Sequence, residues 1–139
     1  MKTFFTITPQ NTVTVAILIG LVSATVPAWA GQAEDPLKTA VELHDGGKIK
    51  EAVAEYDKVI KADPKLAEAY FNRGNAHFGL GQNQQAVRDY SEAIRLNPKD
   101  AEAYFNRANT YRRLKQEPAA LKDYTSAIKL NPDDAKSYT

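Results

Sequence analysis

Residues 67–100 read AEAYFNRGNAHFGLGQNQQAVRDYSEAIRLNPKD, and residues 101–134 read AEAYFNRANTYRRLKQEPAALKDYTSAIKLNPDD. Aligned without a gap, the two segments are identical at 19 of 34 positions. A repeat of this length indicates stacked copies of one small structural unit, each of which buries its apolar face only against its neighbours. The sequence therefore predicts a repeat array rather than a single irregular core.

The residues shared by the two segments stand at the signature positions of one family. They are Tyr70, Gly74, Ala86, Tyr90, Ala93 and Pro98 in the first segment, and Tyr104, Ala108, Ala120, Tyr124, Ala127 and Pro132 in the second. On these residues the chain resembles tetratricopeptide repeat proteins. The resemblance implies an all-α fold, an α-solenoid in which stacked antiparallel helix pairs wind into a right-handed superhelix with a concave and a convex face.

A weaker copy of the same unit precedes these two. Residues 33–66 match residues 67–100 at 9 of 34 positions, and residues 135–139 resemble the opening of a fourth repeat. The first helix is expected to begin at Pro36 with Asp35 as N-cap, because proline fits the first helical position. The further helices are predicted from Lys48 or Ile49 to Ala62 and over residues 67–80, 84–96, 101–114 and 118–130.

The first thirty residues differ from the repeats. Lys2 is followed by an uncharged 14-residue run from Val13 to Val26, and then by Ala28-Trp29-Ala30, which places small residues where a signal peptidase cleaves. The run is shorter than the about 20 apolar residues that span a bilayer. We therefore expect a signal peptide over residues 1–30 of a bacterial protein, cleaved after Ala30, and a repeat domain over residues 31–139 that is periplasmic or secreted. Retention of the segment as an N-terminal anchor is the alternative.

The charge balance bears on the class of partner. The chain has 18 Lys and Arg and 17 Asp and Glu, so removal of Lys2 with residues 1–30 leaves 17 of each sign. Nucleic acids and anionic membranes select proteins with an excess of positive charge, so neither is an expected partner. The chain also has no cysteine, which excludes disulfides, thiol nucleophiles and thiolate metal sites. A protein or peptide remains as the expected partner.

No residue pattern predicts catalysis, a metal or a cofactor. His44 and His77 are the two histidines, and they stand 33 positions apart rather than in a cluster of ligands. His77 aligns with Tyr111 of the next repeat, which is typical of a packing residue. Aspartate and glutamate alternate with lysine and arginine as on a solvated helix face. The sequence thus predicts a protein that is not an enzyme.

The resemblance implies that the first helix of each pair lines the concave face and receives an extended segment of a partner. Carried over residue by residue, it places Glu68, Phe78 and Glu102 on this face together with eight candidate binding residues: Phe71, Asn72, Asn75, Phe105, Asn106, Asn109, Arg112 and Arg113. An asparagine side chain offers both a donor and an acceptor, so repeated asparagines are suited to binding a peptide backbone, with aromatic side chains as apolar anchors. In the alternative interpretation, the asparagines and phenylalanines recur because they pack well and were duplicated with the unit.

The last full helix is the other candidate contact surface. No complete repeat follows it in the sequence, so Leu121, Tyr124 and Ile128 are expected to form an exposed apolar patch that a second copy or another chain could cover. The function expected from the groove is that of a protein-interaction module, acting as an adaptor or assembly factor in the bacterial envelope. A self-assembling scaffold that uses this patch, and a non-catalytic subunit of an envelope complex, are the alternatives.

Overall fold

A computed structural model describes residues 12–14, 25–27 and 35–132. The chain divides into two units, Met1–Glu34 and Asp35–Thr139. In the first, strand β1 (Thr12–Thr14) pairs antiparallel with β2 (Thr25–Pro27), and Val13 lies opposite Val26. Both strands fall within the predicted signal peptide, whereas Ala28-Trp29-Ala30 and residues 135–139 lie outside the described residues. Among the described helices, none combines the length and the apolar character needed to span a membrane.

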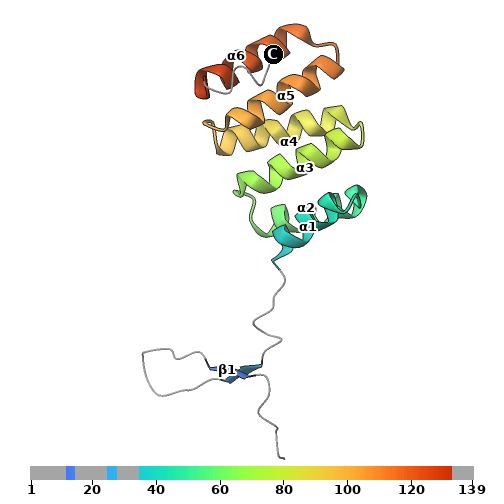
Figure 1. The fold of residues 1–139 in the computed structure, drawn as a ribbon, viewed down its shortest axis with the longest axis vertical. Coiled ribbons are helices and arrows are strands. Elements are labelled where there is room, and N and C mark those ends of the chain that lie inside the picture. The colour runs from blue at the N-terminus through green and yellow to red at the C-terminus, as the bar shows by residue number, and fades with distance from the viewer. Residues whose placement is uncertain (1–11, 15–24, 28–34, 133–139) are drawn as a thin grey trace, which may run out of the picture. The chain divides into compact units, whose positions relative to one another are not determined.

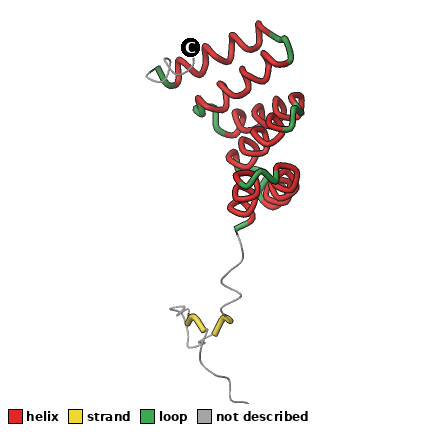
Figure 2. The backbone as a smooth tube through the Cα atoms, turned by 45° about the vertical axis from the view of Figure 1, so that its right-hand side comes forward, coloured by secondary structure: helices red, strands yellow, loops and turns green. Residues whose placement is uncertain are grey.

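Six helices make up the described part of the second unit, as predicted (Figure 1). They are α1 (Pro36–Asp45), α2 (Ile49–Ala62), α3 (Ala67–Gly79), α4 (Asn83–Leu96), α5 (Ala101–Arg113) and α6 (Glu117–Leu130). Each odd-numbered helix packs on the even-numbered helix that follows it, and α2 contacts α3 as α4 contacts α5. Figure 2 shows the three helical hairpins stacked in chain order. The prediction of an all-α solenoid of helix pairs is confirmed.

The helix boundaries follow from local chemistry. Asp35 accepts a hydrogen bond from the backbone N–H of Leu37, so it is the N-cap of α1, as predicted. The predicted ends at residues 80 and 114 are one residue too late, since α3 ends at Gly79 and α5 at Arg113. The predicted starts at residues 84 and 118 are one residue too late for α4 and α6. These two hairpin turns therefore have the predicted length of three residues, but each begins one residue earlier in the sequence than predicted.

Each turn within a hairpin contains one residue with a positive φ. Gly47 has φ 77°, Gly81 has φ 73°, and the third of these positions, 34 residues after Gly81, holds Lys115 with φ 58°. Glycine adopts this left-handed region at no steric cost, whereas a side chain makes it unfavourable. The third hairpin thus makes the same turn as the other two with a less suitable residue.

Small residues allow the helices to approach closely. Ala40, Ala52 and Ala76 are fully buried together with Tyr56, where α1, α2 and α3 meet. A Cβ atom added to Gly74 on α3 would lie 2.8 Å from the Tyr90 ring of α4. The absence of a side chain at position 74 therefore gives this tyrosine the space in which it is buried.

The two ends of the array differ in chemistry. Ala76 of α3 and Thr110 of α5 are fully buried, but Glu42, which occupies the same repeat position in α1, is exposed and forms an ion pair with Lys38 at 3.7 Å. On α6, by contrast, Leu121 is 70% exposed and Ile128 is 39% exposed. The first helix therefore presents charge where later repeats bury small residues, while the last described helix presents apolar side chains.

Candidate functional site

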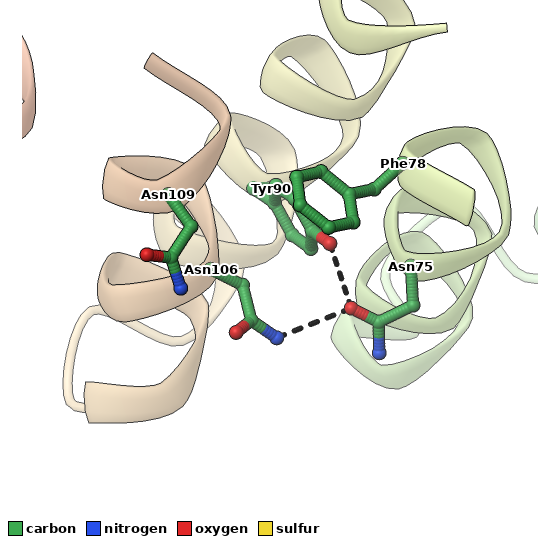
Figure 3. A pocket seen from close by; sticks show the side chains of 5 residues that line it. All are labelled: Asn75, Phe78, Tyr90, Asn106 and Asn109. Atoms are coloured by element: carbon green, nitrogen blue, oxygen red, sulfur yellow. Dashed lines mark hydrogen bonds between the residues drawn. The ribbon is translucent and has the colours of Figure 1, made fainter. Parts of the chain in front are cut away.

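A pocket of about 290 Å³ lies between α3 and α5, with α4 behind it (Figure 3). Its lining residues are Asn75, Phe78, Tyr90, Asn106 and Asn109. Three of the four predicted groove asparagines thus come together at one place. They do so because α3 and α5 are the first helices of neighbouring repeats and present the same face.

Asn75 is held by two neighbours. Its Oδ1 accepts a hydrogen bond from the Tyr90 hydroxyl at 2.7 Å and another from Nδ2 of Asn106 at 3.1 Å (Figure 3). One period later, Oδ1 of Asn109 accepts from the Tyr124 hydroxyl at 2.5 Å. An amide oxygen has two lone pairs, and both of those on Asn75 are used. In the described part of the chain, the Nδ2 donors of Asn75 and Asn109 make no hydrogen bond to another residue. They are therefore available to a ligand.

This arrangement corrects one expectation. The sequence predicted amides that offer both a donor and an acceptor, but two of the acceptors are bound to tyrosines of α4 and α6. Burial raises the pKa of Tyr90, and the nearby charge of Asp89 raises it further, so the hydroxyl remains protonated and can donate. From the sequence, Tyr90 was identified only as a signature residue of the repeat and not as part of the groove. Fifteen residues separate Asn75 from Tyr90, and the same spacing separates Asn109 from Tyr124. This repeated spacing is the sequence signal from which the two tyrosine–asparagine hydrogen bonds could have been predicted.

Asn72 does not join the other asparagines. It is half-buried on α3 and lines neither of the two pockets described here. Asn106, its counterpart in the next repeat, donates a hydrogen bond to Asn75. The residue that corresponds to Asn75 one repeat earlier is Val41, whose apolar side chain cannot accept such a bond from Asn72. The repeated asparagines therefore form one hydrogen-bonded pair across the repeats.

The two predicted phenylalanines contact tyrosines. The ring of Phe71 lies 5.9 Å from that of Tyr90 between centroids, and the ring of Phe105 lies 5.6 Å from that of Tyr124. Tilted pairs at these distances are favourable aromatic contacts. Neither phenylalanine lines the pocket of Asn75, whose aromatic wall is Phe78 and Tyr90. The structure therefore agrees with the packing interpretation for Phe71 and Phe105.

The predicted arginines stand beside this pocket. A second hollow of about 420 Å³ is lined by Phe78, Asn109, Arg112, Arg113 and Glu117, so it shares two residues with the first. The Arg113 guanidinium lies over the Phe78 ring, 3.7 Å from its centre, and its Nη1 donates to the Phe78 carbonyl at 3.3 Å. The two hollows together form what we call the groove.

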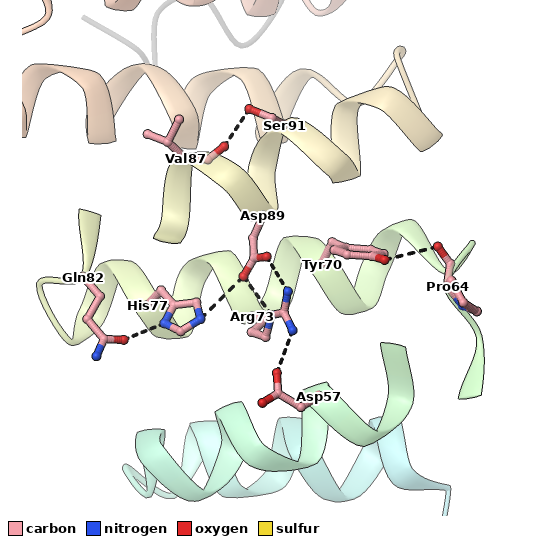
Figure 4. Close-up of polar contacts among 9 residues, drawn as sticks. All are labelled: Asp57, Pro64, Tyr70, Arg73, His77, Gln82, Val87, Asp89 and Ser91. Atoms are coloured by element: carbon pink, nitrogen blue, oxygen red, sulfur yellow. Dashed lines mark hydrogen bonds and ion pairs between the residues drawn. The ribbon is translucent and has the colours of Figure 1, made fainter. Parts of the chain in front are cut away.

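A partly buried polar network supports the helices that carry the groove (Figure 4). Arg73 of α3 donates to both carboxylate oxygens of Asp89, at 2.9 and 2.6 Å, and to Asp57 of α2 at 2.6 Å. Asp89 is 5% exposed, so the prediction of a solvated acidic face is wrong at this position. The hydrogen bond to Asp89 is the main reason why the pKa of Arg73 is raised, and it outweighs the opposing effect of burial. The network links three helices of two repeats.

His77 packs within the array, as predicted, but it does so in polar surroundings. Its Nδ1 lies 2.6 Å from Oε1 of Gln82, and its Nε2 lies 3.7 Å from Oδ2 of Asp89. Over residues 35–132 and the two strands, no group of three or more histidine or acidic residues is arranged to hold a metal ion. His77 therefore belongs to the supporting network.

Comparison with known proteins agrees with this geometry. The family model described as TPR repeat matches residues 41–81 and 74–115, and the model described as tetratricopeptide repeat matches residues 101–134. No curated protein matches the chain in sequence.

Three solved structures illustrate the similarity. MamA is 29% identical with a TM-score of 0.70, over 73% of this chain and 59% of MamA, so the present chain spans little more than half of that protein. The first TPR of Spaghetti (RPAP3), bound to the HSP90 peptide SRMEEVD, is 27% identical with a TM-score of 0.69, over 74% of this chain and 86% of that one. The Arabidopsis OM64 TPR domain is 28% identical with a TM-score of 0.71, over 76% of this chain and 88% of that domain.

Proposed function

Because the chain belongs to the tetratricopeptide repeat family and is, like its relatives, a non-catalytic protein-interaction module, we propose that its groove binds an extended segment of a partner protein. The observation that carries this proposal is the pair Asn75 and Asn106, whose positions are fixed by each other and by Tyr90 at the edge of an open pocket. The Spaghetti domain, which was solved with the HSP90 peptide SRMEEVD, is a related array with a peptide ligand.

The groove is suited to a peptide backbone. The free N–H donors of Asn75 and Asn109 can bind backbone carbonyls, which every sequence supplies. Phe78 and Tyr90 add an apolar wall for a side chain. Since the tyrosine hydroxyls already fix the amides, the protein loses little side-chain freedom when a segment binds.

The test is capture of partners from an envelope extract by the wild-type chain and by Asn106→Ala. This substitution removes one amide of the pocket but leaves the bond between Tyr90 and Asn75 in place. Asn72→Ala is the matched control, because Asn72 is on the same face of the repeat but lines neither hollow. We expect Asn72→Ala to capture the same partners as the wild type, and Asn106→Ala to lose them. Equal capture by both variants would show that the groove is not the binding surface.

We further propose that this module works in the bacterial envelope, as an adaptor or assembly factor. The support is in the sequence: an uncharged run followed by Ala28-Trp29-Ala30, ahead of a helical array that begins at Pro36. Cell fractionation with mass spectrometry of the N-terminus tests it. A periplasmic or secreted chain that begins at Gly31 is expected, whereas a cytoplasmic chain that retains residues 1–30 would contradict the proposal.

A second candidate function is self-association through α6. Leu121 and Ile128 are exposed as predicted, and Leu130 is 40% exposed, whereas Tyr124 is only half-exposed and bonds to Asn109. Analytical ultracentrifugation at micromolar concentration should show dimers that Leu121→Gln reduces. A monomer at all concentrations would exclude this candidate.

A further inference from the structure

One end of the groove carries an excess of positive charge. Arg112 and Arg113 are both exposed in the last turn of α5, and in the described part of the chain neither has a carboxylate oxygen within 4.0 Å. Arg73 and Arg107, by contrast, are paired with buried aspartates. The two exposed arginines are therefore available to an anionic group of a ligand.

Arg113 is also held in position. Its guanidinium stacks on Phe78 at 3.7 Å and donates to the Phe78 carbonyl, so α3 fixes a side chain that belongs to α5. A cation over an aromatic face is stabilised even at an exposed site. Because the guanidinium is already placed, less side-chain entropy is lost when it pairs with an anion.

The local charge count suits a single acidic group. Arg112, Arg113 and Glu117 are the charged residues that line the second hollow, so two positive charges face one negative charge. The pKa of Arg112 is raised mainly by hydrogen bonding to the Tyr124 hydroxyl, and the charge of Glu117 adds a smaller contribution. The excess of one positive charge is enough to favour one carboxylate and too small to favour a polyanion.

We propose that the groove selects extended segments with an acidic side chain, which is seated at Arg112 and Arg113 while the preceding residues lie along Asn106 and Asn109. This rests on the proposed function and adds the chemical class of the partner segment. Six residues separate Asn106 from Arg112 on α5, which is about 9 Å along a helix at 1.5 Å per residue. An extended chain covers about 3.3 Å per residue, so the acidic residue stands about three positions from the one that lies beside Asn106. The carboxylate belongs to a side chain, so a free C-terminus is not required.

The experiment uses a library of synthetic heptapeptides with acetylated N-termini and amidated C-termini, so that side chains provide the only carboxylates. The full chain is used to enrich peptides, in parallel with the double variant Arg112→Gln/Arg113→Gln. The wild type should enrich aspartate or glutamate at one position about five-fold over glutamine, as expected for a partly exposed ion pair. The double variant should bind peptides without this preference.

Two further variants make the result specific. Glu117→Gln removes the opposing charge and should increase the acidic preference, a gain that misfolding could not produce. Arg88→Gln removes an exposed arginine of α4 that lines neither hollow, and it should leave the preference unchanged.

The outcomes separate this inference from the proposed function. Peptides that are enriched without an acidic preference, or with the same preference in the double variant, would overturn the inference, and the groove function would stand if Asn106→Ala abolished the enrichment. No enrichment by the wild type, or enrichment that Asn106→Ala does not change, would overturn both.

Discussion

Arg107 donates to both carboxylate oxygens of Asp123, from Nε at 2.6 Å and from Nη2 at 2.9 Å. Its third donor reaches Ser91 of the preceding repeat at 2.9 Å. Asp123 is 3% exposed. Burial lowers the pKa of Arg107, but the hydrogen bond and the charge of Asp123 raise it more, so the guanidinium stays charged. One side chain thus joins the two helices of its own hairpin to the hairpin before it.

Removal of Arg107 should therefore be costly. Arg107→Ala leaves a buried carboxylate without its partner, which destabilises proteins by about 3–5 kcal/mol. Urea unfolding should show this loss, while Arg107→Ala combined with Asp123→Leu should recover most of it. An effect of Arg107→Ala below about 1 kcal/mol would mean that water replaces the arginine.

Gly74→Ala should destabilise the protein, although alanine is the better helix former by about 1 kcal/mol. The new Cβ would lie 2.8 and 2.9 Å from Tyr90 ring atoms, and overpacking of this kind costs about 1–3 kcal/mol. Gly79→Ala is the control in the same helix, because beyond its own stretch of helix backbone nothing lies within 4 Å of its added Cβ, and it should be neutral or stabilising. Thermal unfolding of the two variants should shift in opposite directions; a shared upward shift would show that the Tyr90 ring moves aside.

Lys115→Gly should stabilise the third hairpin. A non-glycine residue in the left-handed region costs about 1–2 kcal/mol, whereas the extra freedom of glycine in the unfolded chain costs about 0.4–1 kcal/mol. A net gain of up to about 1.6 kcal/mol in the free energy of unfolding is therefore expected at φ 58°. The reciprocal change, Gly81→Ala at φ 73°, should be destabilising. Chemical denaturation measures both, and a destabilised Lys115→Gly would show that the lysine makes contacts worth more than the strain.

Buried tyrosines predict unfolding at alkaline pH. Burial raises the pKa of Tyr56 from 10.0 to about 12, with further contributions from Asp45 and Glu68, and burial raises that of Tyr90 as well. Since the folded-state pKa lies above the unfolded value, the contribution of each neutral hydroxyl to stability is complete below pH 10. The contribution of Tyr56 is lost as the pH rises through about 12. Circular dichroism melts between pH 9 and 12 should show the loss begin above about pH 10. Tyr56→Phe should make the decrease of the melting temperature with rising pH less steep.

The sequence was sufficient for the helices because each of their signals is local. Helix caps, proline positions and helical periodicity predicted all six helices. For α3–α6 the predicted first and last residues differ from the observed ones by at most one residue. The site was harder to predict because it depends on which side chains meet between helices. Asn75 and Asn106 were found through the resemblance, but the tyrosine that fixes Asn75 comes from α4 and was identified only as a signature residue of the repeat. Asp89 and Asp123 were assigned to the surface by residue type, although Arg73 and Arg107 precede them by the same 16 residues in both repeats.

The ion pair of Lys38 and Glu42 on α1 limits how copies of this protein could associate. An α6 face that packed on α1 of the next copy would join unlike surfaces, and contacts of that kind continue into filaments when they do not close. Such a contact would have to bury the Lys38–Glu42 pair against Leu121 and Ile128, and burying charge against apolar side chains is costly. Association of two α6 faces around a two-fold axis avoids this cost and uses up the apolar surface of both copies. If copies associate through α6, the charged first helix would therefore favour closed pairs over open-ended polymers.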